Sequence, residues 1–83
     1  NRAVAVSMAS GPQEALRLVD ELADEPALAE YPPLPAVRAD LLERLGHNEE
    51  AAAEYKHAVL LTANTRRRAE LMRRAEVCAA AGA

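Results

Sequence analysis

The chain has 83 residues, of which 51% are hydrophobic, yet it contains no Phe, no Trp and only two Tyr. Much of the apolar content is alanine, which favours helices and lets their backbones approach closely. So few large apolar side chains cannot fill the core of a sandwich or a barrel, and the composition therefore predicts a single, thin, all-α domain over residues 1–83.

The net charge of −3 is unevenly distributed. Residues 1–50 hold ten acidic and four basic side chains, a balance of −6, whereas residues 51–83 hold three acidic and six basic ones, a balance of +3. This disfavours a protein that binds nucleic acid over its whole surface, where a strongly basic balance is usual. The single cysteine, Cys78, excludes an internal disulfide and fits a reducing cytoplasm. No apolar run approaches the ~20 residues that a membrane-spanning helix needs, so we expect a cytoplasmic location without membrane contact.

The chain begins in an apolar run without an initiator Met, NRAVAVSMA, which predicts a short first helix over residues 1–9 and a fragment of a larger protein. The next helix is predicted from Pro12 to about Asp24. Ser10 and Gln13 have the spacing of a capping box, and Pro12 is tolerated in the first turn because its missing N–H has no partner there. The apolar residues expected to form its buried stripe are Ala15, Leu18, Val19 and Leu22.

A connection rich in proline is predicted from Glu25 to Pro35, because successive prolines disfavour a helix interior. Leu28 and Tyr31 are expected to anchor this connection against the helices. Residues 34–64 then predict two helices joined by a tight turn. The first carries apolar residues at helical spacing on one face, namely Leu34, Val37, Leu41 and Leu45.

Gly46 is expected to stop this helix in a left-handed conformation, and Asn48 to cap the next one. The second helix should bury the residues of its inner side: Ala51, Ala52, Tyr55, Ala58, Val59 and Thr62. A last helix is predicted to start at Asn64 or Thr65. Its expected apolar stripe is formed by Leu71, Met72, Ala75 and Cys78, and residues 79–83 are expected to fray.

Small residues fall where paired helices would cross, at Ala39, Ala51 and Ala58. Together with the turn glycine and the aromatic residue between the last two alanines, this pattern resembles a tetratricopeptide (TPR) repeat. Gly11 and Gly46 lie 35 residues apart, close to the ~34-residue period of such repeats. We therefore expect a short TPR-like stack of antiparallel helix pairs with about five helices.

Several blocks in order also resemble one family: NRAVAV, the Gly11-Pro12 turn with EALRLVDEL, then AVRADLLERLG and EAAAEYKHAVLLTAN. They are similar to the C-terminal extension of one group of extracytoplasmic-function (ECF) sigma factors, over Asn1 to about Arg74. The resemblance implies a regulatory domain that modulates transcription initiation through contacts with the sigma core domains of the same chain or with RNA polymerase. The family commonly has an aspartate before the Gly-Pro turn, where this chain has Ser10.

The expected site is a protein-interaction surface, without catalytic, cofactor or metal residues. The turn formed by Ser10, Gly11 and Pro12 is one candidate contact, since turns held by rigid helices often carry recognition, although capping alone also explains it. Arg38 and Asp40 are the other candidates. They are expected on the outer positions of a groove lined by residues 12–24 and 34–46, which would accept a segment of the parent protein.

Other chemistry is less favoured by the sequence. The arginines of the last helix, at positions 66, 67, 68, 73 and 74, suit phosphates, but the nearby Glu70 and the absence of a stacking aromatic favour a solvated face. His47 and His57 lack the further ligands that a metal site needs. The alternative functions are a stand-alone TPR-like adaptor that binds a peptide or partner helix, and a helical DNA-binding domain; an enzyme is least favoured. The cut N-terminal end is also a candidate contact for a homodimer.

Overall fold

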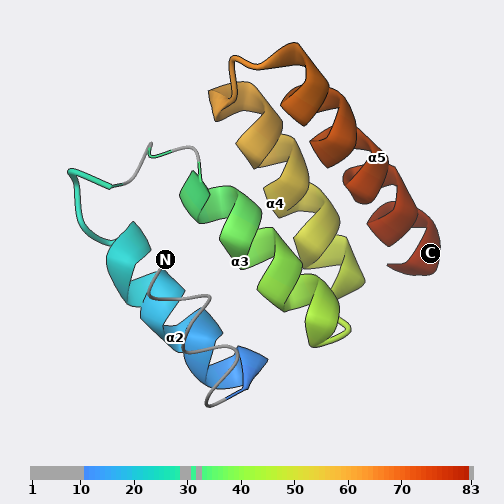
Figure 1. Ribbon diagram of the computed structural model, residues 1–83. Helices are drawn as coiled ribbons and strands as arrows, with labels where there is room; N and C mark the ends of the chain where they lie inside the picture. The colour runs from blue at the N-terminus through green and yellow to red at the C-terminus, as the bar shows by residue number, and fades with distance from the viewer. Residues whose placement is uncertain (1–10, 29–30, 32, 83) are drawn as a thin grey trace.

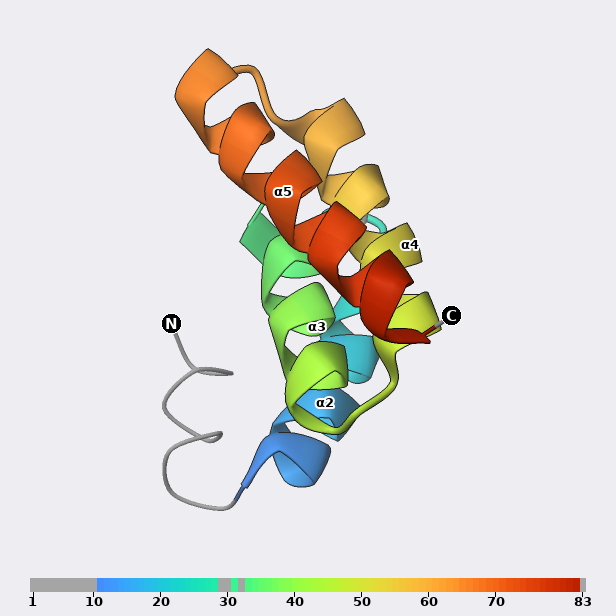
Figure 2. The same ribbon diagram turned by 90° about the vertical axis from the view of Figure 1, so that its right-hand side faces the viewer.

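The computed structural model describes residues 11–28, 31 and 33–82. These residues form four α-helices and no strand: α2 (Pro12–Ala23), α3 (Pro33–Arg44), α4 (Asn48–Leu61) and α5 (Thr65–Gly82). The helices stand in a row in chain order and alternate in direction, as Figures 1 and 2 show from two sides. The all-α prediction is thus confirmed. The helix predicted over residues 1–9 lies outside the described residues, so four helices are shown where about five were expected.

Helix α3 begins with two prolines in its first turn. It starts at Pro33, one residue before the predicted Leu34, and Pro35 is buried within the turn. The first backbone N–H groups of a helix have no intrahelical acceptor, so the N–H groups that proline lacks are not missed there. The prolines therefore end the connection and start the helix.

The turn between α3 and α4 is a Schellman motif. Gly46 has a φ of 81°, its N–H donates to the Glu43 carbonyl over 3.0 Å, and the His47 N–H donates to the Leu42 carbonyl over 2.9 Å. The predicted left-handed glycine is confirmed. The predicted Asn48 cap is wrong: Asn48 is already the first helical residue, His47 is the N-cap, and no side-chain hydrogen bond caps α4. The tight turn brings the chain back into helical geometry one residue earlier than the sequence indicated.

The other two helix starts differ from each other. Gly11, with a φ of 90°, is the N-cap of α2 and supplies no side-chain bond, while Ser10 lies outside the described residues. At α5, the Oδ1 atom of Asn64 accepts a hydrogen bond from the backbone N–H of Arg67 over 2.8 Å. The prediction that α5 starts at Asn64 or Thr65 is confirmed, with Asn64 as its cap.

The core depends on small residues at the places where the helices cross. Ala39, Ala51 and Ala58 are each fully buried, as the sequence predicted. They belong to one cluster that joins α3, α4 and α5. Since alanine keeps two helix axes close, the packed helices form a slab with extents of 27 × 27 × 18 Å.

Helix α3 is buried on two sides. Leu41 packs with Ala15 and Val19 of α2, whereas Leu42 belongs to the cluster shared with α4 and α5. Of the single apolar stripe predicted for this helix, Leu34, Val37 and Leu41 face α2, and the side that faces α4 was not predicted. A helix between two neighbours needs apolar residues on both sides, which blurs the pattern of an amphipathic helix.

Three further predictions are wrong. Tyr31 is 52% exposed and so does not anchor the connection, and Met72 is 38% exposed although it was placed in the stripe of α5. Met72 follows the buried Leu71 by one position, which turns its side chain ~100° around the helix and away from the packed side. The chain also stays helical to Gly82, because the last turn packs on α4: a Cβ at Gly82 would lie 2.9 Å from the Cγ atom of Glu49.

Candidate functional site

An open cavity of about 840 Å³ lies between α3 and α5, and we call it the α3–α5 groove. Its apolar surface comes from three helices: Ala36, Val37 and Leu41 on α3, Tyr55 on α4 and Leu71 on α5. No residue of the described α2 lines it. The groove predicted between residues 12–24 and 34–46 is therefore wrong: Val19 and Leu41 fill the seam between α2 and α3, and the groove lies between α3 and α5 instead.

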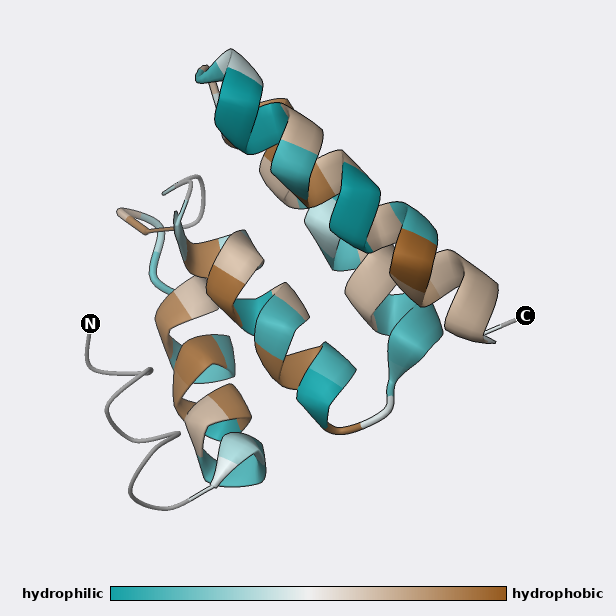
Figure 3. Ribbon diagram, turned by 45° about the vertical axis from the view of Figure 1, so that its right-hand side comes forward, coloured by the Kyte–Doolittle hydropathy of each residue, from teal (hydrophilic) through white to brown (hydrophobic). Residues whose placement is uncertain are grey.

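The edges of the groove are charged and predominantly basic. Four arginines and two carboxylates line it: Arg44, Arg67, Arg73 and Arg74, with Asp40 and Glu70. Arg44 pairs with Asp40 at 3.0 Å and Arg67 with Glu70 at 3.4 Å. These pairs involve side chains that are about half exposed, and such pairs contribute only ~0–1 kcal/mol each. Figure 3 shows that the first turns of α5 are hydrophilic.

One wall of the groove is held by Glu43 of α3. Its Oε1 atom accepts a hydrogen bond from the Tyr55 hydroxyl over 2.9 Å and one from Nη2 of Arg74 over 2.6 Å. Burial raises the pKa of Tyr55 to about 12; the Arg74 charge opposes this rise and the Glu43 charge adds to it. The Glu43 carboxylate therefore joins three helices at the edge of the groove.

Cys78 lies close to this group, and its side chain is buried. Burial raises the pKa of the Cys78 thiol, and the nearby Glu43 charge acts in the same direction. The thiol therefore stays protonated at neutral pH and packs as a small apolar side chain, in agreement with its predicted place in the α5 stripe.

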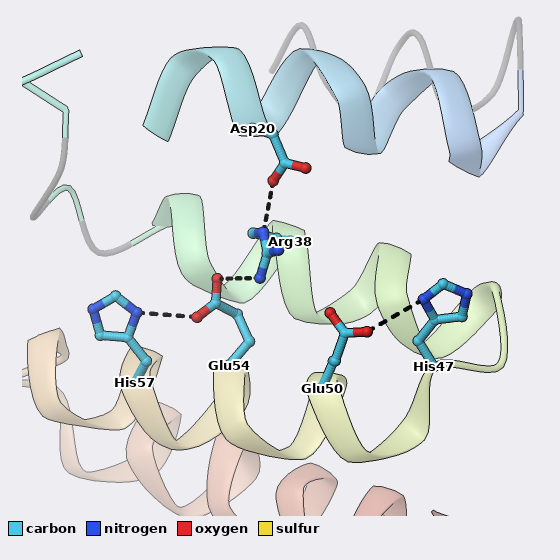
Figure 4. Close-up of polar contacts among 6 residues, drawn as sticks. All are labelled: Asp20, Arg38, His47, Glu50, Glu54 and His57. Carbon is cyan, nitrogen blue, oxygen red and sulfur yellow. Dashed lines mark hydrogen bonds and ion pairs between the residues drawn. The ribbon is translucent and has the colours of Figure 1, made fainter. Parts of the chain in front are cut away.

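Arg38 lies at the centre of a second polar network, which Figure 4 shows. Its Nε atom donates to Asp20 of α2 over 2.7 Å, and its Nη1 atom donates to Glu54 of α4 over 3.1 Å. Glu54 in turn lies 3.0 Å from Nδ1 of His57. Partial burial lowers the pKa of Arg38, but the hydrogen bonds with the two carboxylates outweigh it and leave the pKa raised. The Arg38 side chain thus ties α2 and α4 to α3.

The structure separates the residues that the sequence grouped as one site. Asp40 lines the α3–α5 groove, whereas Arg38 joins helices and does not line it. Gly11 and Pro12 form the start of α2, which contributes nothing to the groove. The sequence analysis also failed to predict Arg73 and Arg74 as groove residues. Both lie next to the buried Leu71 and Ala75 along α5, which could have indicated a place at the edge of the packed side. The whole arginine group was instead interpreted as a solvated face.

The histidines lie at the surface, as predicted. About half of each side chain is exposed, and His47 lies 3.7 Å from Glu50 (Figure 4). Among the described residues, no group of three or more histidine, cysteine or acidic side chains is placed to hold a metal ion. In the same part of the chain, none of the helices combines the length and hydrophobicity needed to cross a membrane.

Searches of protein-family models, of curated proteins and of solved structures find no match to this chain. What the candidate site can bind is therefore inferred from its geometry alone. An apolar floor drawn from three helices and a basic edge are suited to holding the apolar side of another polypeptide, because protein interfaces combine a buried apolar centre with a polar rim.

Proposed function

We propose that this chain is a protein-interaction domain that holds a segment of another polypeptide, or of its parent protein, in the α3–α5 groove. The observation that carries the proposal is the groove itself, about 840 Å³ in volume, with its apolar floor and charged edges. An amphipathic helix that lays its apolar side into such a groove is a common mode of peptide recognition.

We infer in addition that the four helices form a short TPR-like stack. The antiparallel neighbours, the buried alanines at the crossings and the left-handed Gly46 at the turn support this inference. In such a stack, α3 and α4 make one helix pair, and α5 begins the next. The side that α3 and α5 share is then the binding side of the stack.

The resemblance to the ECF sigma-factor extension supports a role in bacterial transcription. In this proposal the domain lies in the cytoplasm, contacts the sigma core domains or RNA polymerase, makes no direct contact with DNA, and modulates initiation. The stand-alone adaptor is the alternative, and it would use the same groove for an unrelated peptide.

This proposal makes residues 1–83 a domain of a sigma factor, and the test uses that sigma factor. Transcription from its cognate promoter is compared with and without these residues, together with binding to RNA polymerase. We expect both to change on deletion. If transcription output and polymerase binding are both unchanged, the role in transcription is refuted.

A photoreactive amino acid then locates the contact. It replaces Arg44 at the groove edge, and in a control it replaces Arg68, which is exposed on α5 and does not line the groove. We expect crosslinks to the sigma core or to polymerase from position 44 and not from position 68. Crosslinks from position 44 to an unrelated protein would favour the adaptor, and equal crosslinking from both positions would contradict binding in the groove.

A further inference from the structure

We infer that the α3–α5 groove takes an acidic amphipathic segment, with apolar side chains on the floor and carboxylates against the arginines. This inference rests on the proposed function, since it names the chemistry of the partner that the groove accepts. The two can fail separately: a groove that holds a neutral or basic segment would still be an interaction site.

Charge complementarity is the first argument. The molecule has a net charge of −3, but four arginines and only two carboxylates line the groove. Among the described residues, Arg73 takes part in no ion pair. The groove is therefore a positive region on an acidic protein, which attracts carboxylates and repels basic segments.

The arginines that do have partners remain available to a ligand. The side chains of Arg44, Arg67 and Arg74 are each about half exposed, at 56%, 54% and 51%. An exposed ion pair is worth only ~0–1 kcal/mol, so a carboxylate of a bound segment can replace the internal partner at little cost. Guanidinium groups also match carboxylates in a two-bond geometry, which favours acidic side chains over other acceptors.

The spacing of the arginines indicates a helical partner. Arg67 and Arg74 are seven residues apart on α5, which places them ~10 Å apart along the helix axis. Carboxylates two turns apart on a partner helix have the same spacing. Such a helix would present its apolar side chains at helical intervals between them, against the partly exposed Val37, beside which Ala36 and Leu71 are buried.

Nucleic acid is the competing acidic partner, and the floor of the groove disfavours it. Single-stranded nucleic acid binds through bases stacked on exposed aromatic rings. The one aromatic residue that lines the groove, Tyr55, is only 4% exposed and uses its hydroxyl to bind Glu43. An apolar floor gains free energy from burying apolar side chains and offers nothing to a sugar–phosphate backbone.

The test selects peptides from a displayed random library on the whole 83-residue chain. We expect the enriched sequences to combine leucine-like residues at helical spacing with Asp and Glu. Their affinity should fall ~10-fold or more in Arg73→Glu and less than ~2-fold in Arg68→Glu, which makes the same charge change outside the groove. Arg73→Lys keeps the charge but loses the two-bond geometry, so its affinity should lie between those of the unchanged protein and Arg73→Glu. Duplex or single-stranded DNA should not displace a bound peptide at physiological salt.

Each outcome decides one of the two claims. Selected peptides that crosslink from position 44 but carry no acidic enrichment, or that bind Arg73→Glu as well as the unchanged protein, overturn the acidic partner and leave the interaction groove standing. Displacement of the peptide by DNA overturns the choice of protein over nucleic acid. A selection in which no peptide crosslinks from position 44 overturns both the groove and its partner. Circular dichroism of each variant confirms that its helices are retained.

Discussion

Removing the Glu43 carboxylate should destabilise the fold mainly through one hydroxyl. In Glu43→Ala the Tyr55 hydroxyl, on a residue that is only 4% exposed, loses its acceptor. A buried polar group left without a partner costs ~1–3 kcal/mol. The Arg74 pair adds less, ~0–1 kcal/mol, because the Arg74 side chain is about half exposed and meets water. The free energy of unfolding should therefore fall by about 2 kcal/mol, measured by urea denaturation followed by circular dichroism.

Three further variants separate the hydroxyl from the charge. Glu43→Gln keeps an oxygen that accepts from the hydroxyl and should cost under ~1 kcal/mol. Tyr55→Phe removes the donor and should cost ~1 kcal/mol. In the double variant Glu43→Ala/Tyr55→Phe no buried polar group is left unpaired, so its cost should be smaller than the sum of the single costs by ~1 kcal/mol. Additive costs within ~0.5 kcal/mol, or equal costs for the Gln and Ala variants, would refute the reasoning.

Two more predictions follow from the described contacts. Gly46→Ala should lower the free energy of unfolding by ~1 kcal/mol in urea denaturation. The cause is backbone strain alone, because φ is 81° and no atom other than those of the chain neighbours lies within 4 Å of the added Cβ. Gly46→Asn should cost less, and an alanine variant as stable as the unchanged protein would contradict the left-handed turn. In a Tyr31→Phe background, tyrosinate absorbance should report a pKa near 12 for Tyr55 in the folded protein. Because burial raises this pKa above its ordinary value of 10.0, the stabilisation is complete below pH 10 and is lost as the pH rises toward 12, a loss that Tyr55→Phe should lack.

The elements of the fold could be predicted from local signals. Gly46 requires a left-handed conformation, Asn64 offers a capping oxygen, and the alanines mark the crossings, so each signal is contained in a few neighbouring residues. The wrong prediction for the end of α5 depended on a distant contact. The end of α5 was predicted to fray because its sequence gives no local stop, yet Gly82 packs against Glu49, a residue more than thirty positions earlier.

The site was harder to predict for the same reason. Which side of α3 carries a groove depends on how closely α2 approaches, and Leu41 and Val19 close that seam with side chains from separate helices. The sequence analysis placed Arg38 and Asp40 together on the outer positions of a groove helix. On a helix, however, residues two apart point in different directions, ~200° around the axis. Arg38 therefore meets Asp20 and Glu54, while Asp40 faces the groove.

Glu43 stabilises the fold by binding Arg74, so an acidic ligand in the groove must compete with Glu43 for Arg74. Arg74 lines the groove and also binds Glu43, so an acidic ligand that draws Arg74 away must replace this internal bond. Tyr55 continues to donate to Glu43 whether or not the ligand is bound, since its hydroxyl lies on a buried residue.

In Glu43→Gln the Arg74 charge is no longer neutralised, while the acceptor for Tyr55 remains. Acidic peptides should therefore bind this variant several-fold more tightly than the unchanged protein, by fluorescence anisotropy, although its fold is slightly less stable. Equal or weaker binding would show that Arg74 serves only to hold the helices together.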